Sequence, residues 1–124
     1  MVWRKSESRS YFGGSIMELQ KLTKAIWDTS RRIEDGVNTL AKKAKEYAEA
    51  EKEYRLALGK EILILREQGI QATLIPDIAR GNTAELKFKR DLAEVTYKTC
   101  KEMLQGLQAE LSGYQSILRI QQDI

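Results

Sequence analysis

Four glutamates near the middle of the chain are the residues whose type and spacing could do chemistry. They are Glu46, Glu49, Glu51 and Glu53. Clustered carboxylates can bind a metal ion or act as general acid and base, but di-iron helical bundles also need inward-facing Glu-x-x-His pairs. The chain contains no histidine, and lysines and arginines are interspersed among these glutamates. The pattern therefore predicts a solvated, salt-bridged helix face, with no metal ligand and no catalytic residue.

The single cysteine, Cys100, is the other candidate for chemistry. A reactive thiol needs a neighbouring base to form the thiolate, and no histidine is present to supply one. Cys100 falls on a predicted apolar seam, so we expect a small packed residue there. The chain also lacks a phosphate-binding glycine loop, a CxxC pair and a Ser/His/Asp set. We expect a protein that is not an enzyme and that has no cofactor.

The basic residues are concentrated in the N-terminal segment. The net charge is +3, and residues 1–16 carry three basic residues against one acidic residue. The remaining residues are therefore close to neutral, with both signs interspersed. The segment combines charge with aromatic rings, a composition suited to single-stranded nucleic acid. A nucleic-acid arm would use Trp3, Arg4, Lys5 and Arg9; the alternative is a polar tail with no function of its own.

Two long segments have the apolar periodicity of amphipathic helices, with steps of three and four residues. Such a seam is typical of helices that pack on another helix in a coiled coil. In the first segment the seam consists of Leu22, Ile26, Ile33, Leu40, Tyr47, Tyr54, Leu58 and Ile62. In the second it consists of Ala93, Tyr97, Cys100, Leu104, Leu107, Leu111, Tyr114 and Leu118. We expect these sixteen residues to form the helix–helix interface.

Capping signals and breakers predict the boundaries of these elements. Residues 1–14 have no periodicity and form a flexible arm or an extension. A capping box at Ser15–Glu18 opens a helix over 15–67. A connector over 68–81 follows, with Gly69 at the helix end, Thr73 capping a short helical turn and Pro76 in its first turn. Asn82, with Glu85 three residues later, begins a second helix over 82–124.

The predicted fold is all-α. Two helices of similar length joined by a compact connector fold back as a long antiparallel helical hairpin over 15–124. The second helix has additional apolar residues away from its seam, Phe88, Leu92 and Val95. A hairpin alone would leave them in water, so the pattern predicts a second copy and a four-helix bundle. The alternative is that the apolar connector covers Phe88 and Val95 within one chain.

Three further features can each be explained either by contact with another molecule or by packing within one chain. The connector residues Ile70, Leu74, Ile75 and Ile78 form a docking tip if they are exposed, or pack under the helix ends. Gly106 and Gly113 share one helical face and either admit a close helix or are tolerated at exposed positions. Arg90 occupies a seam position, where it either pairs with a glutamate of the facing helix or extends to water.

No apolar stretch is long enough to span a membrane. The cysteine usage fits a cytosolic protein.

Four sequence motifs occur in a fixed order along the chain: KKAKEYAEAEKEYRLALGKEI, LREQG, TLIPDIARGN and AELKFKRDLAEVTY. This order resembles a group of small helical proteins encoded by tailed phages and prophages of Gram-positive bacteria, over about 17–119. The resemblance implies a phage accessory protein of the host cytosol and no catalytic residues. The sequence therefore predicts a helical interaction or scaffolding module that forms a homo-oligomer. A factor that binds nucleic acid in replication or recombination is the alternative.

Overall fold

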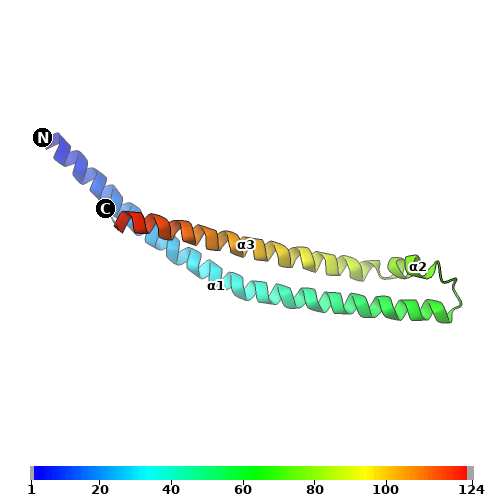
Figure 1. Ribbon diagram of the computed structural model, residues 1–124. Coiled ribbons are helices and arrows are strands. Elements are labelled where there is room, and N and C mark those ends of the chain that lie inside the picture. Colours follow the sequence, from blue (N-terminus) through cyan, green and yellow to red (C-terminus); the bar gives the residue numbers. More distant parts are fainter. Residues whose placement is uncertain (1, 123–124) are drawn as a thin grey trace. The chain divides into compact units, whose positions relative to one another are not determined.

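The computed structural model describes the backbone of residues 2–122 and the side chains of residues 16–122. This part of the chain forms three helices and no strand: α1 (Val2–Glu67), α2 (Ile75–Asn82) and α3 (Ala84–Gln122) (Figure 1). The prediction of an all-α fold is confirmed. The chain divides into two compact units. Unit 1 comprises Met1–Val37 and Met103–Ile124, and unit 2 comprises Asn38–Glu102.

Unit 2 is an antiparallel helical hairpin. Contacts between α1 and α3 run in opposite order along the two helices. The rings of Tyr47 and Tyr97 stack with centroids 6.1 Å apart, and the Lys89 ammonium lies 3.1 Å from the Glu53 carboxylate. Nearer the turn, a Glu61 carboxylate oxygen accepts a hydrogen bond of 2.7 Å from the side-chain amide of Asn82, the last residue of α2. As residue numbers rise along α1, the residue numbers of its contact partners fall, so the two segments are antiparallel.

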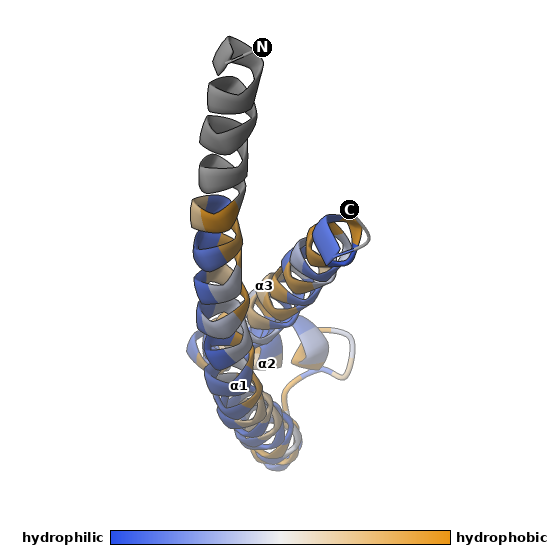
Figure 2. Ribbon diagram, turned by 90° about the vertical axis from the view of Figure 1, so that its left-hand side faces the viewer, coloured by the Kyte–Doolittle hydropathy of each residue, from blue (hydrophilic) through white to orange (hydrophobic). Residues whose placement is uncertain are grey.

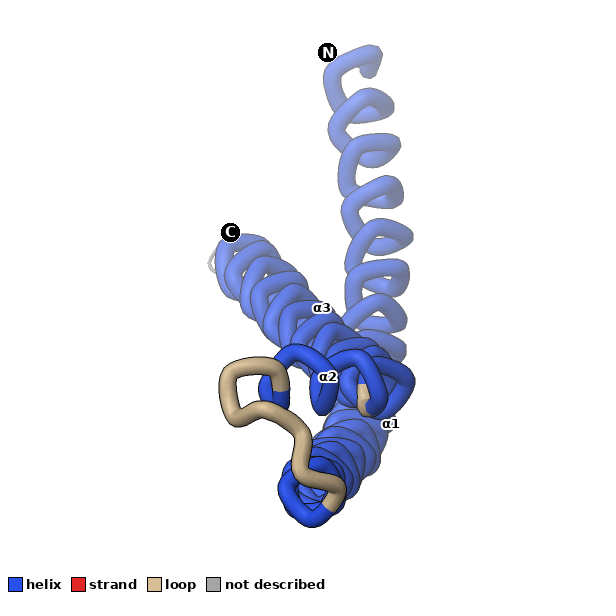
Figure 3. Tube along the Cα trace, turned by 90° about the vertical axis from the view of Figure 1, so that its right-hand side faces the viewer, coloured by secondary structure: helices blue, strands red, loops and turns tan. Residues whose placement is uncertain are grey.

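The core of unit 2 lies at the closed end of this hairpin. It consists of Leu65, Ile75 and Ala79, against which Leu58, Ile62 and Ile70 pack. Ile75 and Ala79 are four residues apart and so share one face of α2. The amphipathic short helix therefore packs against the end of α1, and Figure 3 shows the loop that joins these two helices.

The end of α1 is a Schellman motif. The N–H of Ile70 donates to the Leu65 carbonyl at 3.1 Å, and the N–H of Gly69 donates to the Arg66 carbonyl at 3.0 Å. Gly69 has a φ of 75°, a left-handed conformation that a Cβ atom would strain. The predicted helix end and the role of Gly69 both match the structure.

Unit 1 also pairs α1 with α3 in antiparallel order. Near one end of the unit, a Cβ atom placed on Gly36 would lie 3.2 Å from Leu104 Cδ1. Farther along, Leu22 of α1 and Tyr114 of α3 line the same groove. In the coloured parts of Figure 2, both long helices carry hydrophobic and hydrophilic residues along their length, as expected for amphipathic helices.

The predicted starts of both long helices differ from the structure. Helix α1 begins at Val2, so the Ser15–Glu18 capping box lies inside a helix rather than at its start. A glycine inside a helix costs only about 1 kcal/mol relative to alanine, so Gly13-Gly14 is a weak breaker. The predicted start of the first helix at residue 15 is therefore wrong for the backbone.

The connector differs as well. Helix α2 continues through Gly81 to Asn82, and α3 begins at Ala84. Asn82 is not the N-cap of α3, because its side chain binds Glu61 instead. Thr73 does not cap α2, whose N-cap residue is Leu74 with no side-chain hydrogen bond. Both predictions used local capping signals, and at Asn82 the contact with Glu61 of α1 overrides that signal.

Candidate functional site

The sixteen predicted interface residues all lie in partly or fully buried positions. Leu22, Tyr54 and Leu104 are buried, and the other thirteen are half-buried. Eight of them belong to each unit. Cys100 is among the half-buried ones. The period of the sequence thus selects the sides of α1 and α3 that face each other within each unit.

Arg90 forms a polar cluster inside the seam of unit 2. Its guanidinium carbon lies 5.0 Å from the centroid of the Tyr54 ring. Its Nε lies 2.9 Å from an Asp91 carboxylate oxygen, and its Nη1 lies 3.6 Å from Glu51 of the facing helix. Only 19% of the Arg90 side chain is exposed. The alternative that pairs this arginine with a glutamate of the other helix matches the structure, and such a pair favours one alignment of the helices.

A tyrosine and a carboxylate extend this cluster. Partial burial raises the pKa of the Tyr47 phenol, and the negative charges of Glu51 and Glu94 raise it further. A hydrogen bond from Lys98 lowers the pKa of the Glu94 carboxyl, with the Lys98 positive charge adding to the effect. These groups hold one another in their ordinary charge states, since the phenol stays protonated and the carboxylate ionised.

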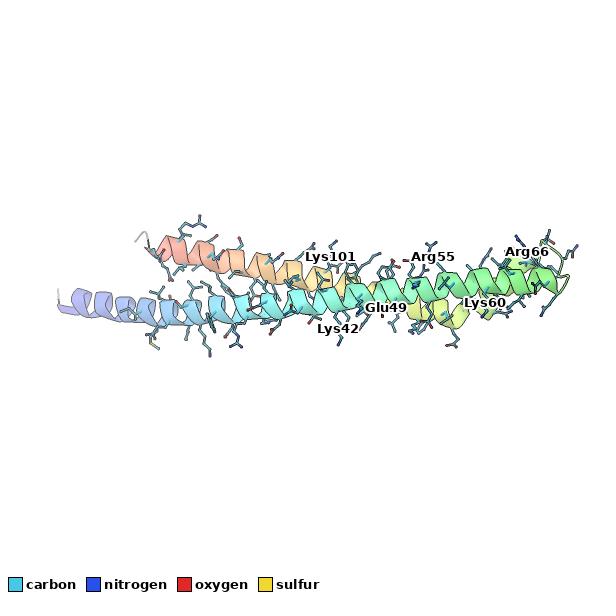
Figure 4. The ribbon with its side chains drawn as sticks, turned by 90° about the horizontal axis from the view of Figure 1, so that it is seen from below. Lys42, Glu49, Arg55, Lys60, Arg66 and Lys101 are labelled. Carbon is cyan, nitrogen blue, oxygen red and sulfur yellow. The ribbon has the colours of Figure 1, made fainter. Side chains whose placement is uncertain are left out.

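Three of the four glutamates of the predicted charged face pair with cations. Glu46 pairs with Lys43 at 3.2 Å, Glu51 with Arg55 at 3.1 Å and Glu53 with Lys89 at 3.1 Å. Figure 4 labels exposed charged side chains of unit 2 on both helices: Lys42, Glu49, Arg55, Lys60, Arg66 and Lys101. Over the residues that the structure describes, no group of three potential metal ligands occurs.

A groove of about 440 Å³ runs between α1 and α3 in unit 2. Ala50 of α1 and Ala93 of α3 line it, and their small side chains leave space between the two helices. Its lining comprises Lys43, Glu46, Glu49, Ala50, Glu53, Lys89, Leu92, Ala93 and Thr96. The sequence analysis did not predict this groove, because the groove needs residues of both helices.

An apolar face of α3 borders this groove. Phe88, Leu92 and Val95 are 68%, 55% and 60% exposed. Their steps of four and three place them on one side of the helix. The alternative in which the connector covers Phe88 and Val95 within one chain is therefore wrong. The connector packs on the end of α1 instead.

The four predicted tip residues divide between core and surface. Ile75 is buried and Ile70 is half-buried, both within the core of unit 2. Leu74 and Ile78 are exposed and lie four residues apart. The predicted docking tip is therefore only partly at the surface.

Gly106 and Gly113 of α3 have open space around them, whereas Gly36 of α1 is packed closely against another residue. A Cβ atom at Gly106 or Gly113 would meet nothing within 4 Å, whereas one at Gly36 would press on Leu104. The structure thus gives a packing reason for Gly36 only. Gly106 and Gly113 lie at open, exposed positions.

A second groove, of about 330 Å³, lies in unit 1 and was not predicted. It lies between Leu22 and Ala25 on α1 and Tyr114 and Ile117 on α3. Gln121 also lines it, and its buried Oε1 accepts no hydrogen bond. The side chains of the predicted nucleic-acid arm, Trp3, Arg4, Lys5 and Arg9, lie outside the described residues.

Comparisons with protein-family models, with curated proteins and with solved structures found no match to this chain. Within residues 2–122, no helix combines the length and the apolar character needed to cross a membrane.

Proposed function

We propose that this protein is a non-enzymatic helical interaction module that works by self-association, as a dimer whose paired hairpins make a four-helix, coiled-coil-like bundle. The observation that supports this proposal is the balance of apolar residues. Among the described residues, seven apolar residues are buried, while sixteen large ones are exposed. The intrachain core is thus thin, and many large apolar side chains remain exposed to water.

We infer the cellular setting from the order of sequence motifs. The resemblance of residues 17–119 to small phage-encoded helical proteins supports a scaffolding or accessory role in the host cytosol. Polar clusters such as that of Arg90 stabilise helix pairing, which supports a role in interactions between helices.

Light scattering of the purified full chain at rising concentration tests this function. We expect the molar mass to approach twice 14.2 kDa. A chain that stays monomeric at the highest soluble concentration would contradict self-association.

A second candidate function is nucleic-acid binding through the basic N-terminal segment. Residues 1–16 carry most of the net charge, whereas the remainder is nearly neutral. Full-length protein with Arg4, Lys5 and Arg9 changed to alanine should lose salt-dependent binding of a labelled oligonucleotide. The matched control changes the exposed residues Lys42 and Lys60 to alanine. Equal binding by both variants would exclude the arm.

A further inference from the structure

We propose that the exposed face of α3 in unit 2 is the dimer contact, and that two copies of α3 pair antiparallel across it. This inference rests on the proposed self-association and names its surface and geometry. Phe88, Leu92 and Val95 continue to Thr99 in steps of four, three and four, and all four are exposed. Such spacing is that of a second heptad seam, on the same helix as the intrachain seam.

The charged residues beside this face favour one relative orientation of the two α3 helices. Asp91 and Lys98 are seven residues apart and therefore lie on the same border. Their side chains are 46% and 65% exposed. The opposite border, beside α1, has Lys89 and Thr96 at equivalent positions, and Lys89 is already paired with Glu53.

In an antiparallel pair, each border of one α3 helix lies beside the same border of the other α3 helix. With Leu92 of one copy packed beside Val95 of the other, Asp91 of each copy comes near Lys98 of the other copy. A two-fold axis makes this pair twice. The second border then places Lys89 opposite Thr96, which brings no like charges together.

Parallel pairing gives no such match. It would oppose the border of Asp91 with that of Thr96, and no ion pair forms between copies. Charge complementarity therefore favours a second copy in antiparallel orientation over a parallel one.

Within one chain, Asp91 and Lys98 have other partners that remain compatible with this contact. Asp91 pairs with Arg90 and Lys87, and Lys98 pairs with Glu94. By the step of about 100° per residue in an α-helix, these partners lie on the side of Asp91 and Lys98 away from Phe88, Leu92 and Val95. Both side chains therefore turn from these solvent-exposed, weak pairs to the pairs between copies when the dimer forms.

The size of the contact predicts its strength. A standard stable interface buries about 800 Å² per partner. Three large apolar residues and Thr99 provide only part of this area. We therefore expect a dimer that dissociates on dilution rather than an obligate one.

Charge exchange tests the pairing through sedimentation of full-length variants. Asp91→Lys and Lys98→Asp should each weaken the homodimer about tenfold, because each replaces two attractive pairs by two repulsive ones. An equimolar mixture of the two variants should form a dimer at least as well as the unchanged protein. The double variant D91K/K98D should also recover, which separates loss of pairing from loss of fold.

Leu92→Glu provides an independent test, with Leu56→Glu as the matched control. Leu56 is 65% exposed on α1 of the same unit, and it lies outside the proposed contact. We expect the first variant to be monomeric and the second to dimerise normally. A dimer that persists in Leu92→Glu, or a mixture of the charge variants that fails to recover, would overturn this contact and leave self-association standing. An unchanged protein that never dimerises would overturn both.

Discussion

The two unexplained glycines of α3 lead to a quantitative prediction. Replacing Gly106 and Gly113 by alanine should stabilise the protein, because alanine loses less conformational freedom on folding than glycine does. Each change is worth about 0.5–1 kcal/mol in a helix interior. A Cβ at either position meets no atom within 4 Å, so no clash offsets the gain. The positions are about 10 Å apart along the helix, so the two effects should add to about 1–2 kcal/mol.

Thermal unfolding followed by circular dichroism measures this effect. For a domain of 60–100 residues, each kcal/mol shifts Tm by about 4–8 °C, so the double variant should melt several degrees higher. Gly36→Ala is the matched control, because the same propensity gain there is opposed by the 3.2 Å approach to Leu104 Cδ1. It should gain less than either α3 variant or lose stability.

The outcome also bears on how the α3 surface of unit 1 is used. If the double variant melts lower at every concentration, the assumption of open space at Gly106 and Gly113 is wrong. If it melts lower only at concentrations where the protein self-associates, a second chain approaches the glycine face, and the dimer contact is not confined to unit 2.

Three further predictions concern unit 2. Leu65→Ala removes a buried core side chain and should lower the free energy of unfolding by about 2–3 kcal/mol, which urea titration would show; a loss below 0.5 kcal/mol would contradict the core assignment. Gly69→Ala forces a Cβ into the left-handed conformation and should cost about 1 kcal/mol by the same assay, whereas an unchanged midpoint would mean that the turn rearranges freely. Because burial together with Glu51 and Glu94 raises the pKa of Tyr47 above its usual 10.0, its contribution to stability is complete below pH 10 and is lost as pH rises through the higher folded-state value. Melts from pH 8 to 11 should show a decline in stability that is smaller in Tyr47→Phe, and identical declines would refute the assignment.

The sequence predicts the helical segments and their facing sides well. Periodicity is a local property, and the residues Leu22, Tyr54 and Leu104 of the predicted seams are buried in the structure. The end of α1 was predictable for the same reason, since a Schellman motif depends on a few consecutive residues around Gly69.

The sequence fails where distant segments compete with local signals. Asn82 has the character of an N-cap, but Glu61 of α1 binds its side chain, and α3 starts two residues later. The candidate site shows the same limit. The position of Arg90 in the seam is visible in the sequence, whereas its contacts with Tyr54 and Glu51 depend on how α1 and α3 align.

By itself, the sequence determined that the chain is helical and which stripe of each long helix avoids water, because side chains three and four apart always share a side of a helix. Only the tertiary structure decided that the connector packs on the end of α1 and leaves Phe88, Leu92 and Val95 exposed. The physical reason is that burial depends on which segments meet in space, and several apolar surfaces of this chain compete for the same few partners.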